Sequence, residues 1–325
     1  MRPSPPRFRL ASLVFWLLAA GAPARPAEIP AGGAFDPGRA GFEVRVRGEL
    51  SAYRFLGVYA LPGETLRIEV PKPGGASFRL RSRDAVIAPS GTARWAWRAP
   101  AEPGLHPLEI ARGDGAVMVL NVFVMVPSGE ARGGYLRGYR LGEYPEKPLG
   151  GLPIYRPPRG FVLVTPENES TPISPHFTLQ QFLCKQAGGY PKLVALRERL
   201  LLKLELLLQL VNDRGWRCDT FAVLSGFRTP FYNRAIGNVP YSRHQWGGAA
   251  DVFIDERPRD GVMDDLDGNG VIDERDADVL YDLFEGASRR EHEVFAGGLG
   301  SYGQTGSHGP FVHVDTRGFR ARWGR

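Results

Sequence analysis

The sequence predicts a multidomain, β-rich chain: an immunoglobulin-like β-sandwich followed by a domain that mixes helices and strands. Its 325 residues amount to about two domains at roughly 100 to 200 residues each. The 43% hydrophobic and 23% charged residues are typical of a globular protein and exclude wholesale disorder or a multispan membrane protein. The 41 glycines and 28 prolines follow no collagen-like period and indicate many turns.

The sandwich is predicted over residues 41–127, where short runs alternate between apolar and polar residues and are separated by Gly/Pro turns. Alternation with period two and enrichment in β-branched and aromatic residues indicate an antiparallel sandwich of immunoglobulin-like type. The runs are FEVRVRG, AYRFLGVYAL, TLRIEV, SFRLRS, ARWAWRAP, LHPLEIA and AVMVLNVFVMV.

Residues 1–24 have the pattern of a signal peptide. The basic segment MRPSPPRFR precedes the apolar run LASLVFWLLAA, and Ala22-Pro23-Ala24 resembles a cleavage signal. We therefore expect a periplasmic or secreted protein with no membrane span in the mature chain. An uncleaved anchor is the alternative, although the apolar run has only about half the length that spans a bilayer.

Cys184 and Cys218 are the only cysteines in the chain. Two cysteines cannot form a disulfide scaffold or a four-thiolate zinc site. Because export permits disulfides, one bridge and two buried free thiols both remain open.

The formal net charge of +6 conceals a segregation of charge. Residues 255–285 hold 12 acidic and 3 basic residues, so the rest of the chain is strongly basic. The arginines are scattered and do not cluster with aromatic residues, which argues against nucleic acid as a partner. An anionic envelope surface and simple solubility are the two explanations for the excess.

Residues 128–172 are rich in Gly, Pro and Tyr and show no strong periodicity, which predicts a linker arm. Two roles are open for its tyrosines: packing against sugar rings, or attaching the arm to its own domain. These tyrosines are Tyr135, Tyr139, Tyr144 and Tyr155. The second domain is predicted over residues 173–325. There Pro191 opens a leucine-rich helical run closed by Gly215, and the buried strand FAVLS follows.

Histidines and aspartates suited to a metal site occur in two later segments. His244 and Asp251 lie seven positions apart in SRHQWGGAADV, and GSHGPFVHVDTRG supplies His308, His313 and Asp315. Two imidazoles and one carboxylate bind Zn²⁺ and leave a fourth position open for water. The sequence therefore predicts a catalytic type of zinc site.

These segments resemble the zinc D-Ala-D-Ala carboxypeptidase and murein endopeptidase family, which is related to lysostaphin- and hedgehog-type zinc proteins. The likeness covers about residues 174–323, through SPHFTLQQFLCKQ, SGFRTPFYN, SRHQWGGAADV and FVHVDTRG. It implies a zinc-peptidase domain in which His244, Asp251 and His313 bind zinc. It also implies that the partner is the stem peptide of peptidoglycan, cut by carboxypeptidase or endopeptidase action.

The proton carrier departs from one pattern of the family. Some relatives have a glutamate three residues before the last histidine ligand, where this chain has Pro310. Others have a histidine five residues before it, which is His308 here. An imidazole suits both proton transfers, so we expect His308 to act as general base and then acid, unless it is only a loop residue. Asp315 is the reserve candidate, or it orients a ligand histidine.

Two further residues resemble substrate-binding positions of the family. Arg228 in SGFRTP matches the arginine that clamps a substrate carboxylate, a role suited to a guanidinium. The alternative is a structural bridge to the acidic insert. Ser242 matches a serine that hydrogen-bonds substrate, and a turn-capping hydroxyl is the alternative.

The acidic insert, residues 255–285, contains the calcium-loop pattern DLDGNGVIDERD. Gly270 provides the sharp turn, and Ile272 is expected to pack. Position 12 is aspartate in place of the usual glutamate, which indicates weak Ca²⁺ binding; a solvated acidic loop is the alternative. The expected ligands are Asp265, Asp267, Asn269, Asp273, Asp276 and the carbonyl of Val271.

The sequence thus predicts an exported zinc peptidase acting on peptidoglycan, with calcium stiffening an insertion. The alternative is a non-catalytic cell-wall-binding protein that contains zinc and calcium.

Overall fold

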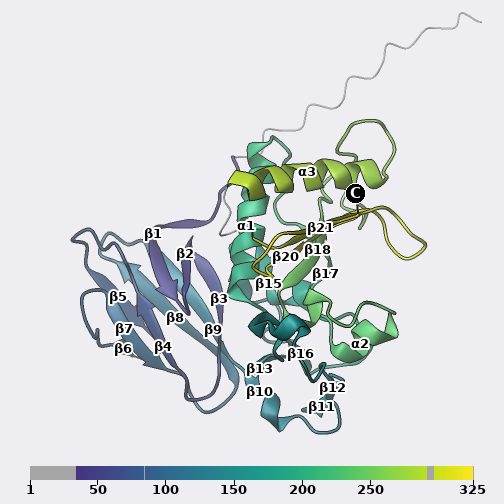
Figure 1. The fold of residues 1–325 in the computed structure, drawn as a ribbon. Coiled ribbons are helices and arrows are strands. Elements are labelled where there is room, and N and C mark those ends of the chain that lie inside the picture. Colours follow the sequence, from purple (N-terminus) through teal and green to yellow (C-terminus); the bar gives the residue numbers. More distant parts are fainter. Residues whose placement is uncertain (1–33, 84, 291–295, 325) are drawn as a thin grey trace, which may run out of the picture. The chain divides into compact units, whose positions relative to one another are not determined.

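The computed structural model describes residues 34–83, 85–290 and 296–324. The predicted signal peptide, residues 1–24, lies outside this part of the chain. The described residues form short strands and three α-helices (Figure 1), so the prediction of a β-rich, multidomain chain is confirmed at that coarse level. No helix among them is long and apolar enough to cross a membrane.

The first nine strands form two sheets around one hydrophobic core. The sheets have the orders β2-β1-β4-β7 and β3-β9-β8-β5-β6, and β3 and β9 pair in parallel. Alternation explains the burial: Val44 and Val46 lie in the core, whereas Arg45 between them is exposed. The strands are β1 Arg39–Val46, β2 Glu49–Tyr53, β3 Phe55–Ala60, β4 Thr65–Glu69, β5 Phe78–Arg81, β6 Val86–Ile87, β7 Arg94–Arg98, β8 Gly104–Arg112 and β9 Val117–Val124.

The segment predicted as a linker arm is ordered and contributes to a second core. Leu136, Tyr139, Tyr155 and Phe161 are buried there, while Tyr135 is exposed. These apolar residues are separated by glycines and prolines, so no period marked them. The elements of this region are β10 Val126–Pro127, η1 Ser128–Glu130, β11 Tyr135–Leu136, β12 Tyr139–Arg140, η2 Leu149–Gly151, η3 Pro153–Tyr155, β13 Gly160–Val164, β14 Pro172–Ser174, β15 Phe177–Thr178 and η4 Leu179–Phe182.

The predicted helix begins later than expected. Residues Lys192–Val194 form strand β16, which pairs antiparallel with β13, and helix α1 spans Glu198–Asp213. The prediction of a helix from Pro191 is therefore wrong at its start. The partner of β16 lies some thirty residues earlier, and local propensity cannot report such a pairing.

Cys184 and Cys218 are both buried free thiols, so the alternative of one disulfide bridge is not realised.

The strands β17, β18, β20, β19 and β21 form one five-stranded sheet in that order (Figure 1). One face of this sheet packs in the second core, and residues of the other face line a cleft. Ala250, Val252, Val312 and Val314 are fully buried in the core to which α1 and α3 contribute. Alternation turns the intervening residues to the other face. The remaining elements are β17 Ala222–Ser225, α2 Pro230–Ala235, η5 Arg243–Trp246, β18 Ala249–Phe253, α3 Glu274–Arg290, β19 Gly298–Tyr302, β20 Phe311–Asp315 and β21 Ala321–Trp323.

Candidate metal centre

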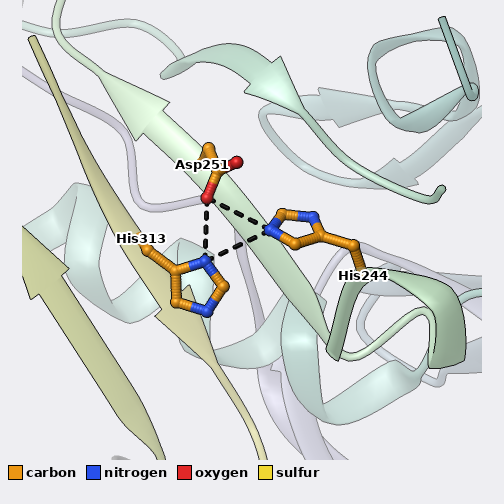
Figure 2. A group of neighbouring side chains, drawn as sticks. All are labelled: His244, Asp251 and His313. Atoms are coloured by element: carbon orange, nitrogen blue, oxygen red, sulfur yellow. Dashed lines mark hydrogen bonds and ion pairs between the residues drawn. The ribbon is translucent and has the colours of Figure 1, made fainter. Parts of the chain in front are cut away.

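His244, Asp251 and His313 come together on the cleft side of this sheet (Figure 2). Asp251 of β18 stands directly opposite His313 of β20 in the antiparallel register. His244 belongs to the short helix η5, which ends at Gly247 with a φ of 63°. A Cβ at Gly247 would lie 2.2 Å from the Ala195 carbonyl oxygen, so glycine allows η5 to approach the sheet.

The three side chains converge on one point. Asp251 Oδ1 lies 3.1 Å from His244 Nε2 and 2.8 Å from His313 Nδ1, and the two nitrogens are 3.2 Å apart. Donors bound to one tetrahedral metal ion with bonds of about 2.0–2.1 Å lie roughly 3.3 Å from each other. All three residues are buried. The spacing therefore fits a single small cation.

The hydrogen bonds of the rings show why a cation fits. His244 Nδ1 donates to the carbonyl oxygen of Gly226 at 2.6 Å, and His313 Nε2 donates to Asp315 Oδ2 at 3.2 Å. In the neutral rings the opposite nitrogens then carry lone pairs. Those lone pairs and a carboxylate oxygen face one another. Three acceptors at this distance repel unless a positive charge lies between them, which a metal ion supplies.

The electrostatic surroundings act differently on the three donors. Burial alone would lower the pKa of His313, but its hydrogen bonds to Asp251 and Asp315 raise it. Burial lowers the pKa of His244, which favours the neutral ring. Burial alone would raise the pKa of Asp251, but His244 and His313 hold it well below its usual value. Arg228 Nη2 donates to Asp251 Oδ2 at 2.5 Å. The guanidinium thereby occupies one carboxylate oxygen and leaves the other for the cation.

Asp315 supports His313 from behind. Its buried carboxylate accepts hydrogen bonds from His313 and Arg317, and Lys203 Nζ donates to its main-chain oxygen at 2.8 Å. Burial alone would raise the pKa of Asp315, but hydrogen bonds from His313 and Arg317 hold it far below the usual range. Burial also lowers the pKa of Lys203 to about 8. An ionised carboxylate behind a ligand histidine fixes the ring orientation.

The donor group opens onto a cleft of about 830 Å³. Its lining residues include the basic Lys185, Arg228, Arg243 and Arg317 and the acidic Asp251. Arg243 itself is 1% exposed, and Arg228 pairs with Asp251. Aromatic side chains also contribute to its walls; they are Tyr155, Tyr232, Tyr241, Tyr302, Phe311 and Trp323. A cleft of this charge suits a ligand that carries carboxylates.

The other residues predicted for the site lie at the same cleft. His308 lines it, and its Nδ1 donates to the Gly309 carbonyl oxygen at 2.9 Å, so Nε2 carries the lone pair. Ser242 lines it and makes no capping hydrogen bond with η5. Arg228 bonds to Asp251 and to Ser225. The alternative of a bridge from Arg228 to the acidic insert is therefore not realised.

Tyr302, Arg317 and Trp323 are among the cleft residues that escaped the sequence-based prediction. Arg317 Nε and Nη2 bond to both oxygens of Asp315, and the Trp323 ring lies 5.1 Å from the ring of His313. Their signals were faint: Arg317 is two residues after Asp315, and Tyr302 is the last residue but one of the glycine-rich stretch AGGLGSYG.

The predicted calcium loop brings three of its carboxylates together. Atoms of Asp265, Asp267 and Asp276 lie within 4.8 Å of one another, and Asn269 Nδ2 donates to Asp267 Oδ2 at 2.8 Å. Asp273 is outside this group of carboxylates, and one of its oxygens accepts from the Arg275 main chain.

Two neighbours of these carboxylates face solvent. Val271 is exposed, and Ile272, which is expected to pack, is 37% exposed. Ile272 therefore packs only in part.

No protein-family model matches the sequence, and a comparison with curated proteins gave no relative. The chemistry of the site must therefore be argued from its own residues.

We expect Asp315→Asn to weaken binding of a divalent metal by about 10- to 100-fold, because the charge that orients His313 is lost. Competition with a chromophoric chelator measures this affinity. Asp114→Asn is the matched control, since it weakens an Arg–Asp pair with Arg112 remote from the cleft. Equal affinity of Asp315→Asn and the wild type would contradict the supporting role of Asp315.

Proposed function

We propose that the chain is an exported zinc-dependent peptidase that hydrolyses amide bonds in peptidoglycan stem peptides. One observation carries the proposal: the buried lone pairs of His244, Asp251 and His313 face one point and border a basic cleft. Two imidazoles and a carboxylate in a tetrahedral arrangement favour Zn²⁺ over hard cations such as Ca²⁺, which prefer more oxygen ligands. Three protein ligands leave one position for solvent.

When bound, zinc supplies an activated water and polarises a carbonyl group. The residues of the chain position the metal ligands and carry the proton. Arg228 donates a hydrogen bond to Oδ2 of Asp251, and the carboxylate of Asp315 orients the ring of His313. His308 lines the same cleft, and in its neutral form Nε2 can accept a proton because Nδ1 donates to the Gly309 carbonyl oxygen; this supports a role in carrying a proton from water to the leaving amine.

The basic lining supports a peptide substrate with free carboxylates. Stem peptides of peptidoglycan carry such groups, and the resemblance to murein peptidases over residues 174–323 points to the same substrate. The N-terminal pattern for export agrees with a substrate outside the cytoplasmic membrane. The two packed sheets of residues 39–124 are consistent with an immunoglobulin-like sandwich beside the peptidase domain.

A second candidate is a non-catalytic cell-wall-binding protein. Pro310, which stands where some relatives carry a glutamate, favours it. Such a protein retains the metal and the basic cleft but lacks turnover, so hydrolysis separates the two.

Purified chain should contain one zinc per molecule and cleave muropeptides; a chelator should stop cleavage and added Zn²⁺ should restore it. His244→Ala should lose both metal and activity because one of three ligands is gone. Mass spectrometry of the products distinguishes loss of a terminal residue from cleavage within a crosslink. His106→Ala, in the sheet strand β8, should behave as the wild type. Zinc-loaded wild type without turnover would favour the binding protein.

We expect His308→Gln to lower kcat by about 10²- to 10⁴-fold, the usual contribution of a general base. The zinc content should stay at one per chain. The pH–rate profile of the wild type should show a limb that the variant lacks. Full hydrolysis by the variant would remove His308 from the mechanism and leave the zinc centre unaffected.

Calcium should stabilise the insert if the loop carboxylates bind it. Binding to the folded state at one hundred times Kd adds about 2.7 kcal/mol to the free energy of unfolding, so the wild-type Tm should rise by several degrees. Asp267→Ala should abolish this rise, while Asp260→Ala, outside the loop pattern, should retain it. An unchanged wild-type Tm in millimolar Ca²⁺ would identify the loop as a solvated acidic turn.

A further inference from the structure

Two glycines make room for an indole beside the metal centre. A Cβ at Gly300 would lie 2.3 Å from Trp323 Nε1, and a Cβ at Gly298 would lie 2.8 Å from Trp323 Cη2. Gly300 stands opposite His313 on one side and opposite Trp323 on the other. The indole therefore lies across β19, with its ring 5.1 Å from that of His313. No side chain larger than hydrogen permits this position.

The indole fixes the hydroxyl of Tyr302. Trp323 Nε1 donates to the Tyr302 oxygen at 2.7 Å. Tyr302 is two residues beyond Gly300, so alternation places it on the cleft face of the sheet. Its ring also stacks on Phe311, with centroids 4.6 Å apart and planes inclined by 13°. The phenol is thus held at two points.

The hydrogen bond from the indole leaves the Tyr302 proton available. An indole N–H only donates, so the Tyr302 oxygen is the acceptor and its own O–H points elsewhere. Among the residues that the structure describes, no acceptor receives it. Tyr302 is 37% exposed and lines the same cleft as Asp251 and His313. Tyr302 therefore borders the space where a substrate would lie, and its O–H can donate to a bound molecule.

The surroundings keep this hydroxyl protonated. Partial burial raises the pKa of Tyr302, and the negative charge of Asp251 adds to that effect. A neutral phenol in a partly buried site is a good donor to an oxygen that gains negative charge.

We propose that Tyr302 is a catalytic residue that donates a hydrogen bond to the carbonyl oxygen of the amide bond being cleaved. Trp323 is the positioning residue that orients the donor. The proton stays on Tyr302, so no bond to it is broken; the contact stabilises the negative charge that develops on the carbonyl oxygen. This inference rests on the proposed peptidase function and adds to it a donor that no sequence motif indicated.

Tyr302→Phe tests the proposal, because it removes the hydroxyl and keeps the ring on Phe311. With muropeptide substrate and zinc-loaded protein, kcat should fall about 10²-fold, the usual cost of one such donor, while KM changes by less than about threefold. Tyr190→Phe is the matched control: it removes a hydroxyl bonded to Glu169, outside the cleft lining. Its kcat should equal that of the wild type.

A second measurement does not depend on turnover. A phosphinate analogue of the stem peptide carries a tetrahedral anionic group in place of the scissile amide. Its affinity, measured calorimetrically, should fall in Tyr302→Phe by a factor similar to the fall in kcat, whereas the affinity for the product peptide should not change. Trp323→Phe keeps an aromatic ring beside His313 but loses the N–H. Its kcat should therefore fall by a smaller factor.

The outcomes distinguish the role of Tyr302 from the peptidase function. If the wild type cleaves and Tyr302→Phe retains full kcat and full affinity for the phosphinate, Tyr302 only packs on Phe311 and the proposal is wrong. If the zinc-loaded wild type does not cleave, the peptidase function fails, and this role of Tyr302 fails with it. Loss of zinc or of folded protein in Tyr302→Phe, judged by metal analysis and Tm, would indicate a structural role and would also overturn the proposal.

Discussion

The arrangement of the second core depends on three buried electron-pair donors that face one point. His244, Asp251 and His313 come from three different elements, and each is held from behind by a partner of opposite hydrogen-bonding character: the Gly226 carbonyl, the Arg228 guanidinium and the Asp315 carboxylate. Without a cation, this convergence costs free energy, since buried acceptors without donors are destabilising. The sheet, the glycine at the end of η5 and the buried carboxylate of Asp315 all maintain it. A bound cation would remove this cost.

The two faces of the central sheet explain how this is possible. Strands β18 and β20 alternate between valines or alanines in the core to which α1 and α3 contribute and residues on the other face. Of the latter, Asp251, Phe311 and His313 line the cleft. The apolar face stabilises the sheet and fixes the register, and the register alone sets Asp251 opposite His313. A slip of one residue would place the ligands in the core. Binding chemistry on one face therefore depends on hydrophobic packing on the other.

The sequence supported predictions where the residues that carry the chemistry also follow a local pattern. Residue types pointed to two segments that hold the histidines and aspartates of the site, and the resemblance to zinc peptidases selected His244, Asp251 and His313 among them. The start of α1 could not be predicted, because the residues before it form strand β16 by pairing with β13, which is distant in sequence. Tyr302 and Trp323 could not either: their contact depends on the parallel pairing of β19 with β21 at the edge of the sheet, which no local pattern reveals. The loop ligands Asp265, Asp267 and Asp276 were recognisable because their spacing is itself the signal.

The Gly/Pro-rich segment, residues 128–172, contacts Arg243, the residue before the candidate metal ligand His244. Arg243 is 1% exposed, and its Nη1 donates to the carbonyl oxygen of Ile154 at 2.8 Å. Its Nε and Nη2 have no partner among the described residues, an arrangement that costs about 1–3 kcal/mol for each unpaired group. Contacts of the guanidinium with the rings of Tyr155 and Trp246, at 4.8 and 5.6 Å, offset part of this cost. Ile154 and Tyr155 both belong to the Gly/Pro-rich segment, residues 128–172. This segment therefore provides a hydrogen bond and an aromatic contact to the buried guanidinium of Arg243, which is next in sequence to the candidate metal ligand His244.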